Sequence, residues 1–232
     1  MLNNSQFILN GKFLSSKNSL FAFPNKVNRM VRNWDIRGKG NQIDCRHTSL
    51  DSTQFEIWGS NNQIIIGADC HFNNVTFHIE GDNHRIQIGN KVRFNVAGSI
   101  WFEDHNGELN VGDESTFENV HLAVTEPYST LTIGQDCMFS YDIDVRTGDS
   151  HSVIAETENR RTNYAENISF GDHVWVTARC VILKGALISS NSIIGTQSVV
   201  TKPFYSEGVV IAGNPAKVIK EGINWKRERV YE

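Results

Sequence analysis

The sequence predicts an all-β fold in which the chain winds into a parallel β-helix, one triangular coil after another. A short aliphatic motif that ends in glycine recurs along the chain. Its glycines are Gly67, Gly89, Gly112 and Gly134, which are 22, 23 and 22 residues apart. After Gly171 the period shortens to six, with inward positions at Phe170, Val176, Ile182, Ile188, Ile194 and Val200. A period of six is typical of coils made of three short strands, whereas a helix repeats every ~3.6 residues and a single strand every two.

Small residues mark the predicted corners of the coils. They lie four residues after the inward positions, at Val174, Cys180, Ala186, Ser192 and Ser198. Cys70 and Cys137 follow inward residues at the same spacing, and the chain has no C-x-x-C pair. Because free cysteine behaves as a small hydrophobic residue, we interpret these three cysteines as buried corner residues rather than redox or metal groups.

The earlier coils are longer and carry an aromatic residue five positions after each glycine, at Phe72, Phe94, Phe117 and Phe139. Their four or five extra residues are polar and turn-forming, and we expect them to bulge from one corner over residues 81–84, 104–107 and 126–129. The next copy of the aliphatic motif ends at Gly171, 37 residues after Gly134 instead of 22. The difference of 15 residues predicts an inserted loop at about 151–167.

We expect one domain over residues 1–232. An open end of a β-helix exposes unpaired backbone and apolar side chains, so residues 1–38 are predicted to form an N-terminal cap. Residues 39–212 are predicted to form the coils. Residues 213–232 are predicted to form a C-terminal tail that contains a short amphipathic helix over Lys217–Arg229.

Charge and hydropathy exclude some classes of function. The net charge is −4 and no basic stripe with interleaved aromatic residues occurs, so we expect no nucleic-acid partner. No apolar run approaches the ~18 residues of a membrane span. Residues 1–10 have no basic segment followed by a long apolar one, and the predicted location is therefore cytoplasmic.

Several motifs resemble a known family. The hexapeptide run, V-V-T-K at Val199–Lys202 and A-G-N-P-A-K-V-I-K at Ala212–Lys220 resemble the left-handed β-helix acyltransferases that use acetyl-CoA. D-V-R-T-G-D-S-H at Asp144–His151 and H-V-W at His173–Trp175 resemble the branch of capsule and polysialic acid O-acetyltransferases. The resemblance covers residues 42–220. It implies a left-handed parallel β-helix, a homotrimer, acetyl-CoA as cosubstrate, and acetyl transfer to a sugar hydroxyl.

His151 stands at the entrance of the predicted insertion and is the candidate general base, since neutral imidazole can take a hydroxyl proton near pH 7. Asp149 or a backbone carbonyl could orient its ring. The resemblance places Trp175 beside the thioester as a donor, and the spacing of 24 residues predicts that one turn brings it to the same cleft as His151. It also assigns Asn119 to acceptor positioning or oxyanion stabilisation, although Asn119 could equally be a corner residue bonded to its own backbone.

The resemblance further assigns residues to acetyl-CoA. Ala178 and Thr196 would line the pantetheine arm, Thr201 and Lys202 would lie near the adenine, and Lys217 and Lys220 would face the phosphates. Within and beside the insertion, Arg146 and Tyr164, together with Arg160 and Arg161, could bind an anionic acceptor. These arginines could instead form salt bridges or face water.

Three other functions compete with this prediction. The same scaffold could acetylate an amine of an amino sugar or sugar nucleotide. A zinc-dependent β-helix of the γ-carbonic anhydrase type would need three histidines that converge on one metal. We expect no metal, because His84 and His105 fall in the polar corner insertions and no H-x-x-x-x-H pair lies on one coil. A β-helix used only for assembly would need neither His151 beside a break in the repeat nor the basic C-terminal segments.

Overall fold

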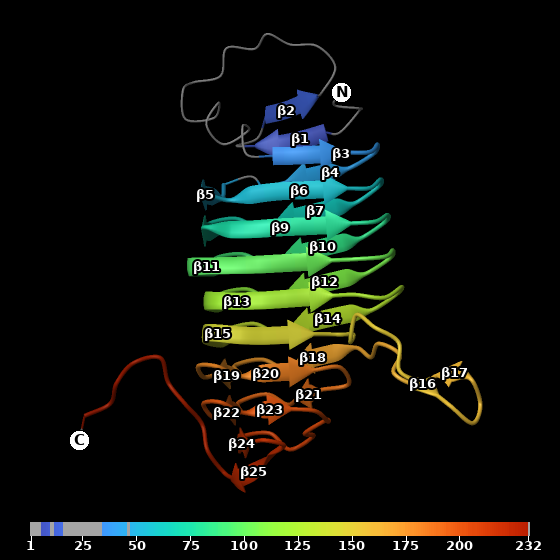
Figure 1. Cartoon of the computed structure of the whole chain (residues 1–232). Coiled ribbons are helices and arrows are strands. Elements are labelled where there is room, and N and C mark those ends of the chain that lie inside the picture. Colours follow the sequence, from blue (N-terminus) through green and yellow to red (C-terminus); the bar gives the residue numbers. More distant parts are fainter. Residues whose placement is uncertain (1–5, 10–11, 16–33, 46, 232) are drawn as a thin grey trace.

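The computed structural model describes residues 6–9, 12–15, 34–45 and 47–231, and no α-helix occurs within them (Figure 1). The described chain is a parallel β-helix with three faces. The first face is a nine-stranded sheet. Its strands are β1 (Gln6–Leu9), β2 (Lys12–Ser15), β4 (Gln42–Asp44), β7 (Gln63–Ile66), β10 (Arg85–Ile88), β12 (Glu108–Val111), β14 (Thr130–Ile133), β18 (Ile168–Phe170) and β21 (Leu187–Ile188).

The other two faces share three long strands that bend at the corner between them: β11 (Arg93–Phe102), β13 (Thr116–Val124) and β15 (Met138–Arg146). The second face contains their first halves together with β5 (Ser49–Asp51), β8 (His71–Asn73), β19 (Trp175–Val176), β22 (Ile193–Ile194) and β24 (Val210–Gly213). The third face contains their second halves together with β3 (Trp34–Arg37), β6 (Gln54–Trp58), β9 (Val75–Glu80), β20 (Val181–Leu183) and β23 (Val199–Val200).

The core follows the predicted register. Each predicted inward residue from Phe170 to Val200 is at most 1% exposed, and Phe72, Phe94, Phe117 and Phe139 are fully buried. The rings of these four phenylalanines stack on one another with centroids 4.4 to 5.1 Å apart. Cys70, Cys137 and Cys180 are buried free thiols at corners, as predicted. Burial raises the pKa of the Cys137 thiol to about 12.

The polar insertions bulge from the corner between the third and first faces, as predicted, and they stack on one another along one edge of the molecule (Figure 1). The 15-residue insertion leaves the coil at the same corner. It extends away from the body as an antiparallel hairpin of β16 (Ile154–Ala155) and β17 (Arg160–Arg161). We call residues 148–167 the arm, and this edge the arm corner.

The start of the coils differs from the prediction. The coils begin at Trp34 rather than residue 39, because β3 already pairs in parallel with β6. Most of the predicted N-terminal cap lies outside the described residues, apart from β1, β2 and residues 34–38. Of these, β1 adds to the first face beside β4 and pairs antiparallel with β2.

The predicted C-terminal helix is wrong. Residues Ala216–Lys220 form strand β25, which pairs antiparallel with β24 and ends the sheet. The β-branched Val218 and Ile219 favour a strand, and the open edge of β24 offers backbone partners that an isolated short helix would lack. After Gly222 the tail continues without regular structure along the outside of the coils.

Candidate active site

The candidate base His151 lies where the arm leaves the body, and its imidazole is exposed. No described residue bonds to its ring, so the predicted orienting partner is not seen. Asp149 instead accepts a hydrogen bond from the His151 backbone N–H through its carbonyl, at 2.7 Å. The structure therefore holds the backbone of His151 and leaves both ring nitrogens available.

Asn163 organises the turn around His151. Its amide nitrogen donates to the carbonyl oxygen of His151 at 2.7 Å and to a carboxylate oxygen of Asp149 at 2.8 Å. Its amide oxygen accepts from the backbone N–H of Val153 at 2.7 Å and from Nε of Arg161 at 3.2 Å. One side chain thus joins both strands of the arm at its base.

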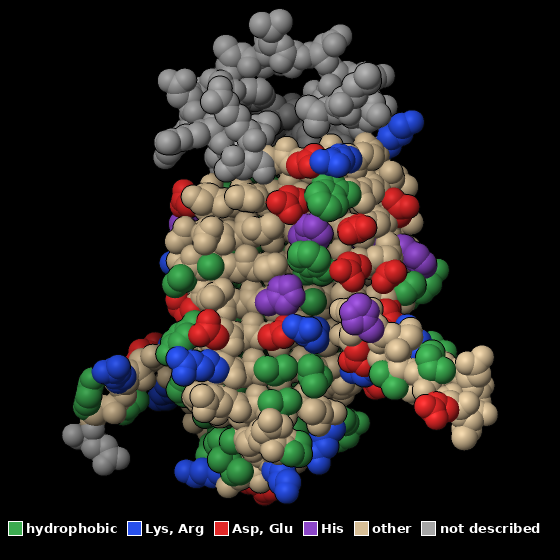
Figure 2. Space-filling view, in the orientation of Figure 1, with side chains coloured by type: hydrophobic (Ala, Val, Ile, Leu, Met, Phe, Trp, Pro, Cys, Tyr) green, Lys and Arg blue, Asp and Glu red, His purple; other side chains and the backbone are tan. Residues whose placement is uncertain are grey.

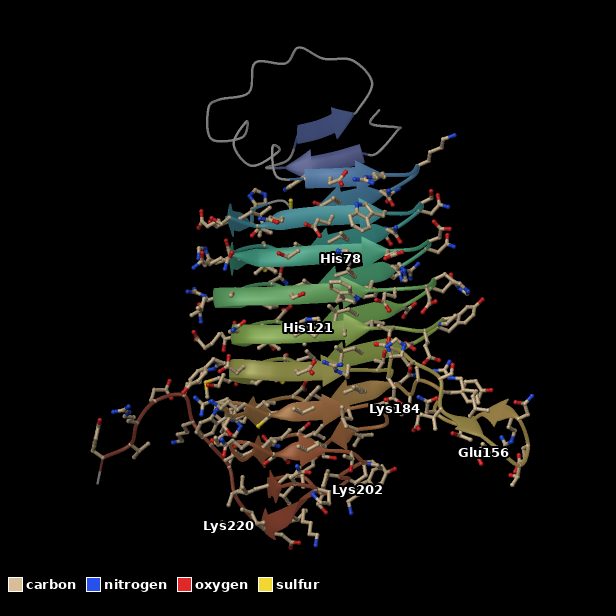
Figure 3. The ribbon with its side chains drawn as sticks, viewed as in Figure 1. His78, His121, Glu156, Lys184, Lys202 and Lys220 are labelled. Atoms are coloured by element: carbon tan, nitrogen blue, oxygen red, sulfur yellow. The ribbon has the colours of Figure 1, made fainter. Side chains whose placement is uncertain are left out.

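Lys184 ties this turn to the body. Its ammonium, from the corner that follows β20, donates to the same Asp149 oxygen at 2.6 Å. This bond, helped by Asn163, lowers the pKa of the Asp149 carboxyl below its usual value although partial burial opposes the shift. Figure 3 shows Lys184 beside the base of the arm, with Lys202 one coil further on.

A cavity of about 250 Å³ opens beneath the arm. Asp149 and Glu166 of the arm line one side, and Lys184, Thr201 and Lys202 line the other. The two residues predicted for the adenine end of acetyl-CoA, Thr201 and Lys202, therefore lie in the same cavity as the turn that carries His151. We call Asp149, His151, Glu166, Lys184, Thr201 and Lys202 the arm edge.

Trp175 lies in a different place, on the second face at β19, and it is partly exposed. None of the described residues accepts a hydrogen bond from its indole N–H. Ala178 and Thr196, the residues predicted for pantetheine, stack at the corner that follows β19 and β22, where Gln197 N–H donates to the Ala178 carbonyl at 3.0 Å. We call Trp175, Ala178 and Thr196 the tryptophan edge.

The C-terminal tail packs beside the tryptophan edge. The Trp225 ring, 6% exposed, stacks on His173 with centroids 4.0 Å apart and lies 5.9 Å from the Trp175 ring. Its indole N–H donates to the His173 carbonyl at 2.8 Å. Arg227 donates to Asp136 at 2.8 Å. Although partial burial alone would raise it, the bonds from Arg227 and His173 lower the pKa of Asp136.

The arm edge and the tryptophan edge lie on opposite sides of a single chain (Figure 1). Strand β19 is on one side of the third face, and the arm leaves from the other. The prediction that one turn brings His151 and Trp175 to the same cleft is therefore not met within one chain, because the coil crosses the whole third face between them.

The remaining predicted residues are spread over the surface. Asn119 is exposed at the bend of β13, beside Tyr141. Arg146 lies at the end of β15 on the third face and forms an ion pair with Asp144, so its position favours the structural alternative. Figure 2 shows histidine, hydrophobic and charged side chains along the middle of this face. Lys217 and Lys220 are exposed on β25 at the C-terminal end of the β-helix.

On the arm, Tyr164 is exposed and packs against the guanidinium of Arg161, whose carbon lies 5.1 Å from the ring centroid. Arg161 pairs with Glu126 of the body, and Arg160 pairs with Glu158. Three of the four candidate acceptor-binding groups, Arg146, Arg160 and Arg161, are thus engaged in ion pairs. Tyr164 offers its ring and hydroxyl at the surface of the arm.

Sequence reasoning missed Asn163, Lys184 and Trp225. Asn163 stands in a polar segment without periodicity, and only the hairpin pairing of β16 with β17 brings it to His151. Trp225 could have been noticed as a large aromatic residue in an otherwise charged tail. Within the described residues, no three histidine, cysteine, aspartate or glutamate side chains gather where they could hold a metal ion, and no helix is long and apolar enough to cross a bilayer.

No family model matches the chain. A curated relative, polysialic acid O-acetyltransferase of Neisseria meningitidis, is 31% identical over 196 residues, which span 84% of this chain and 90% of that protein. The structure of the polysialic acid O-acetyltransferase OatWY superposes with a TM-score of 0.80 at 28% identity, covering 85% of this chain and 93% of that one. That of the polySia-specific acetyltransferase NeuO superposes with a TM-score of 0.77 at 29% identity, covering 86% and 90%. The chain therefore belongs to the polysialic acid O-acetyltransferase branch of the hexapeptide-repeat acetyltransferases.

Proposed function

We propose that this protein transfers acetyl from acetyl-CoA to a hydroxyl of a sugar in a capsular or other surface polysaccharide, such as polysialic acid or its precursor. The relative in Neisseria meningitidis is named a polysialic acid O-acetyltransferase and matches this chain over most of both lengths. The observation that carries the proposal is the turn around His151. It fixes the backbone of a histidine whose ring has no described partner, beside a cavity with two lysines.

In the proposed reaction, His151 takes the hydroxyl proton as the sugar oxygen attacks the thioester carbonyl carbon. The new carbon–oxygen bond forms and the carbon–sulfur bond then breaks, and the sulfur of CoA leaves with the proton that His151 returns. The indole N–H of Trp175 donates a hydrogen bond to the thioester. Asn119 is a second candidate donor, toward the negative charge that develops on the thioester carbonyl oxygen. The active site needs no further reactant.

The separation of the two edges supports a site shared between copies of the chain. A base and a donor must both contact the reacting group, so the arm edge of one copy would face the tryptophan edge of the next. Repetition of that head-to-tail contact closes a ring, and the family resemblance supports a homotrimer. The same proposal places the protein in the cytoplasm, where acetyl-CoA is made.

Acetyl-CoA would lie between the two edges. Ala178 and Thr196 offer small side chains past which the pantetheine can run. Thr201 and Lys202 line the cavity under the arm, where lysines supply positive charge toward phosphate. Lys217 and Lys220, exposed at the C-terminal end, are the remaining candidates for phosphate, and Tyr164 is the candidate contact with the acceptor.

The test uses labelled acetyl-CoA and a panel of polysialic acid, neutral oligosaccharides and amino sugars. The His151→Ala variant should lose about 10² to 10⁴ in turnover with the best acceptor, the range for loss of a general base. The His71→Ala variant, which removes a histidine on the second face, is the control. Near wild-type turnover in His151→Ala would refute the mechanism, and transfer to amino sugars alone would favour N-acetylation.

Subunit mixing tests the shared site. His151→Ala and Trp175→Phe are each expected to be nearly inactive, the first through the base and the second through the donor. Refolded together at equal concentration, they should regain activity at about a quarter of the sites, because each half is intact in half of the copies. Absence of any recovery would show that both residues act within one chain.

A further inference from the structure

A second groove lies on the arm corner, in the coils before the arm. It has a volume of about 480 Å³ and includes Asn61, Asn83, Arg85, Asn106, Glu108 and Tyr128 among its lining residues. None of these residues belongs to the arm edge or the tryptophan edge. The groove is therefore separate from the site described above.

The stacking of the corner insertions builds this groove. Asn61, Asn83, Asn106 and Tyr128 occupy equivalent positions in four successive insertions, and all four have left-handed backbone angles, with φ between 56° and 64°. Each insertion bonds to the one before it, as when Asn83 N–H donates to Ser60 at 2.9 Å and Tyr128 N–H to His105 at 3.2 Å. At an interstrand spacing of about 4.8 Å, the four side chains form a row about 14 Å long.

The row presents polar groups that the protein leaves uncommitted. The side-chain amides of Asn61 and Asn83 and the guanidinium of Arg85 make no hydrogen bond or ion pair with any other residue in the described part of the chain. Tyr128 is 71% exposed and stands at the end of the row nearest the arm. Amides match hydroxyl and N-acetyl groups, guanidinium matches a carboxylate, and an exposed ring packs on a sugar face.

The groove also connects to the active site. Glu126 belongs to the same turn as Tyr128, and it forms an ion pair with Arg161 of the arm. Arg161 in turn donates to Asn163, the residue that holds the His151 turn. A chain lying in the groove would therefore run directly toward the arm that carries the candidate base.

We propose that this groove binds residues of a sialic acid polymer that lie several units away from the sugar being acetylated. The inference rests on the proposed function. Arg85 would pair with a carboxylate, the asparagines would bond to hydroxyl and N-acetyl groups, and Tyr128 would pack on a ring. The carboxylate of Glu108, which lines the groove beside Arg85, and those of Asp82 and Asp104 on the corner insertions repel an anionic chain, which restricts it to a register with its own carboxylate at Arg85. Contacts with remote units of the acceptor add binding energy that short acceptors lack.

The experiment compares Arg85→Ala and Tyr128→Ala with the matched controls Arg93→Ala and Tyr231→Ala, which remove exposed side chains elsewhere. Acetyl transfer is measured with a sialic acid trimer and with long polysialic acid, and binding to immobilised polysialic acid is measured without acetyl-CoA. Arg85→Ala should raise the KM for the polymer about tenfold or more, the factor expected for loss of a charged hydrogen bond. Tyr128→Ala should also raise this KM, through loss of ring packing on the sugar. Their turnover of the trimer should equal that of the wild type.

Equal losses on trimer and polymer would overturn the proposal, because they would place these residues in the reaction centre or in the fold. Unchanged KM for the polymer, or a wild-type protein that does not bind it, would overturn it as well. Failure of the proposed function would look different. In that case the wild type would bind the polymer, lose that binding in Arg85→Ala, and transfer acetyl to no sugar hydroxyl.

Discussion

Asn163 offers the most direct test of how the structure positions His151. Asn163→Ala removes four hydrogen bonds at the base of the arm, two donated and two accepted. With about 0.5 kcal/mol for each bond at a solvated site, the ordered turn loses about 2 kcal/mol relative to its open forms. Since about 1.4 kcal/mol corresponds to a factor of ten, turnover should fall roughly 10- to 30-fold.

The assay measures kcat and KM for acetyl-CoA across pH, together with thermal unfolding. Because the arm lies outside the core, we expect the unfolding temperature to change little. The pH profile should keep its shape while its plateau falls, since Asn163 positions the histidine and exchanges no proton. Glu156→Gln, at an exposed position further out on the arm (Figure 3), is the matched control and should keep wild-type activity. Wild-type kcat in Asn163→Ala would refute the reasoning, as would a fall that the control shares.

Two further predictions concern the attachments of the tail and the arm. Trp225→Ala removes a buried ring, and such a change lowers the free energy of packing by about 3 kcal/mol in well-packed sites. Trypsin should therefore cut the tail at Lys226 and Arg227 much faster in this variant than in the wild type or in the exposed-site control Trp58→Ala. Equal cleavage rates would show that the ring does not hold the tail against the coils. The pKa of Asp149 is lowered in the folded protein, so its ion pair with Lys184 stabilises the arm fully above the unfolded value of 3.8 and this contribution is lost as the pH falls through the lower folded value. The NMR signals of the Asn163 side-chain amide should change with a midpoint below pH 3.8, and Lys184→Met should move that midpoint to higher pH. A midpoint that stays the same in Lys184→Met would exclude the ion pair as the cause of the lowered pKa.

Most of the fold could be predicted from the sequence because each coil repeats the same local requirement. Inward positions such as Val176 and Ile182 must fill the narrow interior of the coils, and corner positions such as Cys180 must be small. The period of six can therefore be read from the alternation of large and small residues. The tail could not be predicted in this way. Its partner is the open edge of β24, and a single amphipathic pattern over Lys217–Arg229 does not reveal which surface will be available to it.

The candidate site could be predicted only in part. The break in the repeat indicated His151, and the resemblance indicated Trp175. That the two lie on opposite sides of one chain follows only from the arrangement of the three faces, which the sequence alone did not show. The role of Asn163 depends on the antiparallel pairing of Ile154 with Arg161, which no repeat encodes. The catalytic and cofactor roles of all these residues stay predictions until the variants are measured.

The change in coil length has a geometric consequence. Corner bonds join residues 22 or 23 apart in the first coils, 37 apart across the arm and 18 apart after it. The β-helix is thus wide before the arm and narrow after it, and the arm stands at the step. The missing insertions leave a recessed shelf, on which Thr201 and Lys202 lie open. The cavity under the arm is therefore open because the coils after the arm lack the corner insertions of the earlier coils.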